Sequence, residues 1–196
     1  MEQKRLFNRW SWDVKVQDKG LERYIILNPI IYPHTFGRLK KEEKNIVERL
    51  INKLMRGGTG GKIGGKLIRT HGKLQGKKLK VINYVREAFE IIEKKTNQNP
   101  IQILVLAIEN SAPREETTRL QMGRVSYQVS VDSSPVRRID VALRNIALAT
   151  IMRSFNKKIS FAESLAEELI LASQNKLESY AVRRKNEIER IAKSAR

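Results

Sequence analysis

The chain has 196 residues, of which 40% are hydrophobic and only 6% aromatic, so its core must consist mostly of Leu, Ile, Val and Ala, a composition that favours packed helices. Its 39 Lys and Arg face only 21 Asp and Glu, giving a formal net charge of +18, which predicts a polyanionic partner. The sequence has no cysteine, which excludes disulfides, cysteine-ligated zinc and thiol nucleophiles and is typical of an intracellular protein. No segment resembles a signal peptide or a membrane span, so we expect no membrane partner.

Residues 1–40 are predicted to form an extended N-terminal arm. The first 36 residues show little helical periodicity. They carry a set of aromatic side chains, Trp10, Trp12, Tyr24, Tyr32 and Phe36. We expect such an arm to pack its aromatic rings on another surface, because it has no apolar stripe from which to build a core of its own.

The rest of the chain, residues 41–196, is predicted to form one helical domain. Its first helix begins near Lys41 and ends at Gly57-Gly58, and its second carries an apolar stripe over residues 81–92. The third begins at Asn99-Pro100, because asparagine caps a helix well and proline suits the first helical position.

A Gly- and Lys-rich strap, residues 57–78, separates the first two helices. It contains eight of the eleven glycines, and the longer segment from Arg49 to Arg86 has eleven Lys and Arg but no acid. Such a segment buries too little apolar surface to offset its ordering entropy. We therefore expect the strap to be disordered in water and to become ordered on a phosphate backbone.

A β-hairpin over residues 114–132 is predicted next. Apolar residues alternate with polar ones from Val125 to Val131, which places the apolar side chains on one face of a strand. The partner strand is expected from Glu115 to Leu120, with residues 121–124 as the turn.

Three further helices complete a predicted bundle of about six. The first opens at Ser134-Pro135, with Ile139, Ala142, Leu143, Ile146, Ala147 and Thr150 facing inward. The second begins with the capping box of Ser160 and Glu163, and the last begins near Ser179. On the second, we expect Glu163, Glu167 and Glu168 to form an ordinary solvated face.

Catalysis is poorly supported by the sequence. The two histidines, His34 and His71, have no carboxylate or cysteine at a metal-ligand or triad spacing. Residues 60–67 fit GxxxxGK, but Leu67 stands where a P-loop needs a hydroxyl for magnesium. We therefore expect a non-enzymatic protein without cofactor or metal, and a nucleotide hydrolase remains as a weak alternative.

The basic residues lie on the arm, the strap, the long helix and the last helix. This spread suits a large folded RNA that is recognised by shape and charge. An autonomous regulator that binds its own messenger RNA or a DNA site is the alternative that the charge pattern leaves open.

Short motifs in a fixed order resemble one known family. They are INKLM at 51–55, AFEIIEKKT at 88–96, NPIQ at 99–102, AIENSAP at 107–113, SYQV at 126–129, PVRR at 135–138 and AVRRK at 181–185. In order and spacing, over residues 46–196, they resemble the universal small-subunit ribosomal protein seven family in its archaeal and eukaryotic form. Relative to bacterial members the strap is an insertion, and Glu115-Glu116 stands where they are basic.

The resemblance implies a structural constituent of the small ribosomal subunit, cytoplasmic and ribosome-bound. It implies a primary binder of small-subunit ribosomal RNA that organises head assembly beside neighbouring head proteins. The hairpin and last helix would then lie near the exit-site transfer RNA and the messenger path, through Met122, Gly123, Arg124, Arg183, Arg184 and Lys185.

Two arginines at the start of the long helix, Arg137 and Arg138, match family positions that would anchor RNA. The charge distribution adds further expected RNA-binding residues. These are Arg38, Lys53, Arg56, Lys62, Lys66, Arg69, Lys73, Lys77, Lys78, Arg114, Arg119, Arg144, Arg153 and Lys157.

Overall fold

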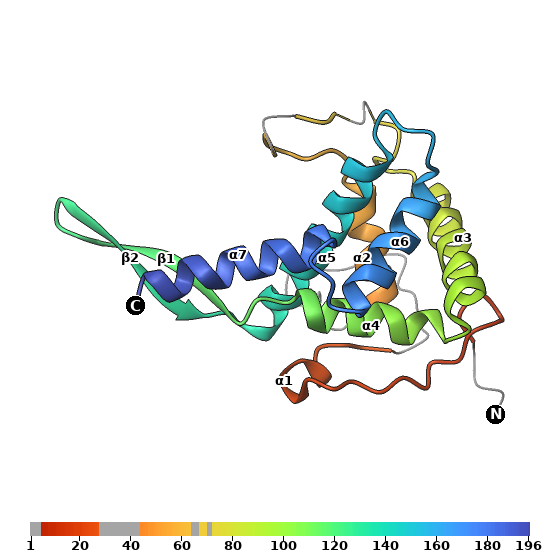
Figure 1. Ribbon diagram of the computed structural model, residues 1–196, viewed down its shortest axis with the longest axis horizontal. Coiled ribbons are helices and arrows are strands. Elements are labelled where there is room, and N and C mark those ends of the chain that lie inside the picture. Colours follow the sequence, from red (N-terminus) through yellow and green to blue (C-terminus); the bar gives the residue numbers. More distant parts are fainter. Residues whose placement is uncertain (1–4, 28–43, 64–66, 70–71) are drawn as a thin grey trace.

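The structure, a computed structural model, describes residues 5–27, 44–63, 67–69 and 72–196. Within these residues it contains the helices α1 (Lys19–Glu22), α2 (Ile46–Met55), α3 (Lys78–Thr96), α4 (Pro100–Ser111), α5 (Pro135–Ser154), α6 (Phe161–Ser173) and α7 (Tyr180–Ser194). An antiparallel hairpin of β1 (Glu115–Met122) and β2 (Val125–Asp132) projects from them (Figure 1). The predicted fold class, mainly helical with an inserted hairpin, is confirmed, and the short α1 is an addition to the expected helices.

Helix α6 lies at the centre of the bundle and packs against α3, α4 and α5. All six residues of α5 predicted to face inward are buried, so the long amphipathic helix is confirmed. Phe89 of α3 is the largest fully buried side chain, and Leu, Ile, Val and Ala make up most of the surrounding core. This composition agrees with the low aromatic content, since a packed helical core needs few rings.

Local capping chemistry sets several helix starts as predicted. The Asn99 Oδ1 accepts the Ile101 N–H at 3.1 Å. Ser160 Oγ accepts the Glu163 N–H, and the Glu163 carboxylate accepts the Ser160 N–H, both at 3.0 Å. These side chains satisfy amides that have no partner within the helix.

Helix α2 begins later than predicted. Asn45 caps it, with Oδ1 accepting the Val47 N–H at 2.8 Å, so the helix starts at Ile46. Residues 41–43 of the predicted start lie outside the described residues.

The described part of the arm packs on the helical bundle of the same chain. Trp10 is buried and meets the Phe89 ring edge-on, with ring centroids 5.7 Å apart. Leu21 of α1 and Ile25 are also buried. The expected packing of arm aromatics on another surface is thus confirmed for Trp10, whereas Tyr32 and Phe36 lie outside the described residues.

Polar side chains of α4 hold the arm backbone in place. The Gln102 side chain accepts the Lys15 N–H and donates to the Lys15 carbonyl, both at 2.9 Å. The Glu109 carboxylate accepts the N–H groups of Gln17 and Asp18 at 2.7 and 2.9 Å. The arm therefore runs along α4, as Figure 1 shows beneath the bundle.

The hairpin has a shorter turn than predicted. Its register runs from Glu115 opposite Asp132 to Met122 opposite Val125, so the turn contains only Gly123 and Arg124 and not residues 121–124. Gly123 has a φ of 62°, a conformation that glycine adopts without steric cost. The apolar side chains share one face as expected, but most of them are exposed on the projecting hairpin.

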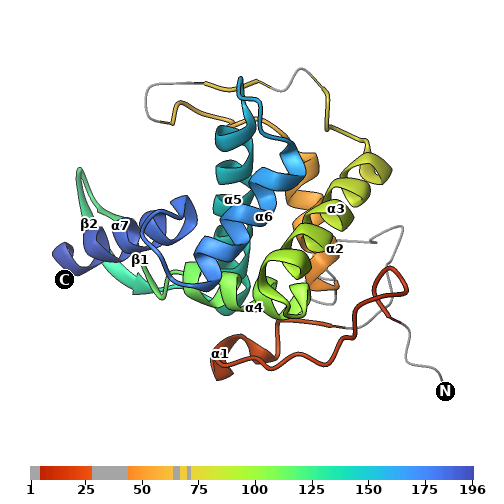
Figure 2. The ribbon, with the colours of Figure 1, turned by 45° about the vertical axis from the view of Figure 1, so that its right-hand side comes forward.

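The strap contains local structure that the sequence did not predict. The Thr59 N–H donates to the Ile68 carbonyl at 3.0 Å, and the Ile68 N–H donates to Thr59 Oγ1 at 3.1 Å. Ile68 and Leu74 are buried. The described strap residues are therefore anchored at these points, and the strap crosses the end of the bundle near the last turn of α5 (Figure 2).

Candidate nucleic-acid interface

A groove of about 1170 Å³ lies between α5 and α7, with residues from the strap at one end. Its cationic side chains outnumber its acidic ones by two to one. The cations are Lys62, Arg137, Arg144, Arg153, Lys157, Arg183, Arg184 and Arg190, and the acids are Glu116, Glu168, Glu178 and Glu187. A low-dielectric wall beneath clustered charges of one sign concentrates their field, so the groove attracts anions.

The groove brings together predicted residues that are far apart in the sequence. Lys62 of the strap, three arginines of α5, Lys157 and two arginines of α7 all line it. Sequence reasoning did not select Arg190, Tyr180 or the apolar lining of the groove. The spacing of three and four residues that joins the lining positions of α5 was the available signal.

The groove cations differ in their intramolecular partners. Arg137 forms an ion pair with Glu116, and the hydrogen bond and charge of Glu116 raise the pKa of this arginine. Arg184 Nη1 lies 2.5 Å from the Glu187 carboxylate, and the Arg183 guanidinium lies 5.9 Å from the centre of the Tyr180 ring. In contrast, Lys62, Lys157, Arg144 and Arg190 form no ion pair within the described part of the chain. Those four are the groove's available anion ligands.

Glu168 lines the groove and is buried, contrary to the expected solvated face of α6. Its side chain is fully buried, whereas Glu163 is exposed and Glu167 keeps 39% of its side chain exposed. The prediction is wrong for Glu168 because the start of α7 covers that side of α6, and spacing within one helix does not show what packs on it.

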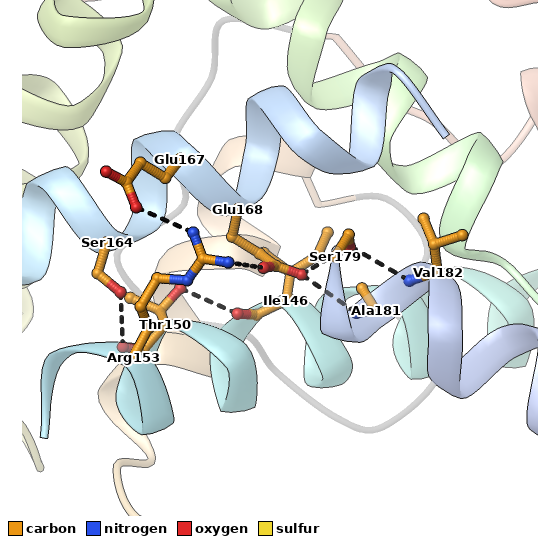
Figure 3. A network of polar contacts seen from close by, with 9 residues as sticks. All are labelled: Ile146, Thr150, Arg153, Ser164, Glu167, Glu168, Ser179, Ala181 and Val182. Carbon is orange, nitrogen blue, oxygen red and sulfur yellow. Dashed lines mark hydrogen bonds and ion pairs between the residues drawn. The ribbon is translucent and has the colours of Figure 1, made fainter. Parts of the chain in front are cut away.

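The Glu168 carboxylate joins three helices. Its Oε1 accepts the Ser179 hydroxyl at 2.7 Å and the Ala181 N–H at 3.1 Å, at the start of α7. Its Oε2 lies 3.8 Å from the Arg153 guanidinium of α5. Arg153 also donates to Glu167 at 2.9 Å, so this arginine is held between two α6 carboxylates (Figure 3). A negative charge at a helix N-terminus stabilises that helix, and here it also fixes α7 relative to α5.

Three predicted RNA-binding residues lie outside the groove and form ion pairs. Arg138 Nη2 donates to Asp18 Oδ2 at 2.7 Å, with only 11% of the arginine side chain exposed. Lys53 lies 3.4 Å from Asp140. Lys78 lies 2.9 Å from the buried Glu48. Their RNA contacts stay a prediction, and the structure gives each of them a role in packing.

The arm carboxylate that pairs with Arg138 has an altered pKa. Burial acts to raise the pKa of Asp18, but hydrogen bonds from Arg138 and the Gly20 N–H, together with the charges of Arg138 and Arg114, lower it below its usual value. The charged form is thus favoured in the folded protein.

The remaining predicted residues are spread over the end of α2, the strap, the hairpin and α7. Exposed side chains belong to Arg56, Arg69, Lys73, Lys77, Arg114 and Arg119, and also to Met122 and Arg124 at the hairpin tip beside Gly123. Lys185 of α7 is half-buried. Arg38 and Lys66 lie outside the described residues, as do both histidines.

The described residues contain no group of three or more His, Cys, Asp or Glu side chains placed to hold a metal ion. None of the described helices is long and apolar enough to cross a membrane. The GxxxxGK-like segment follows α2 and not a strand, and its residues 64–66 lie outside the described part of the chain.

The family model described as ribosomal protein S7p/S5e matches residues 21–196. The match spans α2 to α7, the strap and the hairpin, and therefore every residue that lines the groove. Residues 5–20 of the arm lie outside it.

Proposed function

The chain belongs to the ribosomal protein S7p/S5e family, and on that premise we propose that it is a primary binder of small-subunit ribosomal RNA that organises assembly of the head. Its family makes it a structural constituent of the small ribosomal subunit, active in translation through RNA binding. The proposal adds that the groove between α5 and α7 is the main RNA-contacting surface, and that the protein works in the cytoplasm.

One observation carries this proposal. Arg144, Arg190, Lys62 and Lys157 converge on the groove from four parts of the chain, and none of them forms an ion pair with a described carboxylate. Unpaired cations that share one surface repel one another and cost folding free energy. A phosphate backbone removes that cost and releases its own bound counterions, which is the main source of affinity for RNA.

The finer proposal concerns the hairpin and α7. We place exit-site transfer RNA and the messenger path near Met122, Gly123, Arg124, Arg183, Arg184 and Lys185. Support comes from the packing of α7 along β1 and from the exposed hairpin tip, which projects away from the bundle (Figure 1). Neighbouring head proteins are the other expected partners, since apolar side chains of the hairpin, among them Leu120 and Tyr127, are exposed.

The test measures the affinity of the purified protein for a transcript of the small-subunit head RNA over a range of salt concentrations. Each phosphate contact is expected to lower the logarithm of the affinity by roughly 0.7 to 0.9 for each tenfold rise in salt. A steep slope, together with co-sedimentation with the small subunit at high salt, supports the proposal. A flat salt response contradicts it.

A further inference from the structure

The groove face of α5 carries both arginines and apolar side chains. Arg137, Val141, Arg144, Leu148 and Met152 follow one another at spacings of three or four residues, and all of them line the groove. Such spacing places them in a row along one helix face. The three apolar members are only partly buried, so they form an accessible apolar surface between the arginines.

Helix α7 supplies the opposite wall with the same mixture. Ile188 is partly exposed and lines the groove between Arg184 and Arg190. Tyr180 is half-buried at the groove end, where Arg183 covers its ring. Both walls of the groove therefore carry partly exposed apolar side chains interspersed with arginines, and these apolar side chains form an apolar floor that sets the groove apart from a purely electrostatic patch.

This arrangement discriminates between forms of RNA. An RNA duplex presents phosphates, sugars and a shallow minor groove, and its bases are stacked inside. Arginines alone can bind that surface, and the apolar floor would stay in water. A single strand exposes its bases, which can bury against apolar side chains while the phosphates meet the flanking cations.

We propose that the groove between α5 and α7 binds an unpaired, single-stranded segment of RNA, with bases on Leu148, Met152 and Ile188 and phosphates at Arg144 and Arg190. The proposal rests on the proposed function, since it names the kind of RNA segment that this surface selects. Charge complementarity identifies the occupant as a polyanion, and the apolar floor identifies that polyanion as one with exposed bases.

The test compares the wild-type protein with the double variant Leu148→Gln/Met152→Gln. Glutamine is similar in size to both side chains and adds no charge, and both positions are partly exposed, so folding should be retained. Ile191→Gln is the matched control, because Ile191 is 40% exposed on α7 but does not line the groove. Thermal unfolding followed by circular dichroism checks that all three proteins are folded.

The probes are an unstructured RNA strand of about 12 nucleotides, within the range of single-strand site sizes, and a blunt duplex of the same length. The double variant should bind the single strand about tenfold more weakly. Its affinity for the duplex and its salt slope should be unchanged, and Ile191→Gln should match the wild type on both probes. Equal affinities of the double variant and the wild type for the single strand would overturn the proposal, as would parallel losses on both probes.

A second measurement uses the wild-type protein alone. A single strand substituted with thiouridine is crosslinked by light, and the modified peptides are identified by mass spectrometry. Crosslinks within residues 141–153 or 180–190 support the proposal, and crosslinks confined to other segments overturn it. Displacement of the strand by polyglutamate as readily as by RNA also overturns it, because charge alone would then explain binding.

The two proposals fail in different ways. If the wild type binds neither head RNA nor either probe with a steep salt dependence, the proposed function fails. If the wild type binds head RNA with a steep salt dependence, but the Leu148→Gln/Met152→Gln variant keeps the wild-type affinity for the single strand, only the single-strand inference fails.

Discussion

Arginines on two sides of α5 have different surroundings. On the groove side of α5, Arg137 stays largely exposed although it pairs with Glu116, and Arg144 has no ion-pair partner among the described residues. On the side that faces the arm and α2, Arg138 is bound to Asp18, and Asp140 lies 3.2 Å from the buried Arg49. Arg137 and Arg138 are neighbours in the sequence, so residue type and position in the chain do not separate them.

The difference arises from what packs over each side. Side chains at adjacent helix positions point about 100° apart, because a turn contains 3.6 residues. The arm covers the direction of Arg138 and supplies Asp18, whereas α7 supplies mostly further cations opposite Arg144. A charge under a covering segment must be paired, because desolvation of an unpaired charge is costly. A cation on α5 is therefore available for RNA only where no covering segment has neutralised it.

The largest expected effect comes from Glu168→Ala. The substitution removes the acceptor for the Ser179 hydroxyl and the Ala181 N–H, and it leaves these buried donors unpaired. We expect the free energy of unfolding to fall by about 3 kcal/mol in urea denaturation. The matched control is Glu167→Ala, which removes the more exposed partner of the same Arg153 and should cost less than about 1 kcal/mol. Equal losses for the two variants would mean that the α7 contact contributes nothing.

The next effect separates the two neighbouring arginines. Arg138→Ala leaves the Asp18 carboxylate without its main partner and should lower the unfolding free energy by about 2 kcal/mol. Arg137→Ala, at a side chain 62% exposed, should change it by less than about 0.5 kcal/mol. The comparison of the two sides is wrong if denaturant titration ranks these variants in the opposite order.

Substitution of both Arg144 and Arg190 by alanine should act on binding and hardly on folding. Each lost phosphate contact is expected to reduce the slope of log affinity against log salt by roughly 0.7 to 0.9. Filter binding to head RNA measures this slope. Lys95→Ala is the control, since Lys95 is exposed on α3 and does not line the groove. A slope unchanged in the double variant would remove these arginines from the RNA interface.

The smallest effect is the loss of stability at low pH from the contact between Asp18 of the arm and Arg138 of α5. The pKa of Asp18 is lowered from 3.8 on folding, so its pairing stabilises the protein fully above pH 3.8 and less as the pH falls through the folded pKa. Asp18→Asn removes this contribution. The stability difference between wild type and variant should therefore be constant near neutral pH and shrink below about pH 4. Thermal unfolding at several pH values measures it, and a difference that grows in acid would contradict the pairing.

Features that depend on nearby residues could be predicted from the sequence. The caps of Asn99 and Ser160 and the inward face of α5 follow from chemistry within one or two helical turns, and all are as expected. The hairpin was also predicted from the sequence. Its turn is shorter than the predicted residues 121–124 and contains only Gly123 and Arg124, because strand pairing continues to Met122 and Val125.

Features that depend on contacts between distant parts of the chain could not be predicted from the sequence. In the sequence, Glu168 has the spacing of an exposed helix glutamate, and only the packing of α7 against α6 buries it. Arg138 binds Asp18, which lies 120 residues away in the chain. Most cations that line the groove are among the predicted RNA-binding residues, but their convergence required the packing of α5 against α7. The apolar floor was missed because Leu148 and Met152 lie outside the predicted inward face of α5, and the sequence alone does not show that α7 packs opposite them.

Arginine-specific modification of the free protein and of its complex with head RNA shows whether RNA covers the groove side of α5. With phenylglyoxal as the reagent and mass spectrometry as the readout, we expect Arg144 and Arg190 to react in the free protein and to be protected in the complex. Arg138 should react poorly in both. Full reactivity of Arg144 and Arg190 in the complex, or ready modification of Arg138 in the free protein, would contradict the assignment of the RNA-binding surface to the groove side of α5.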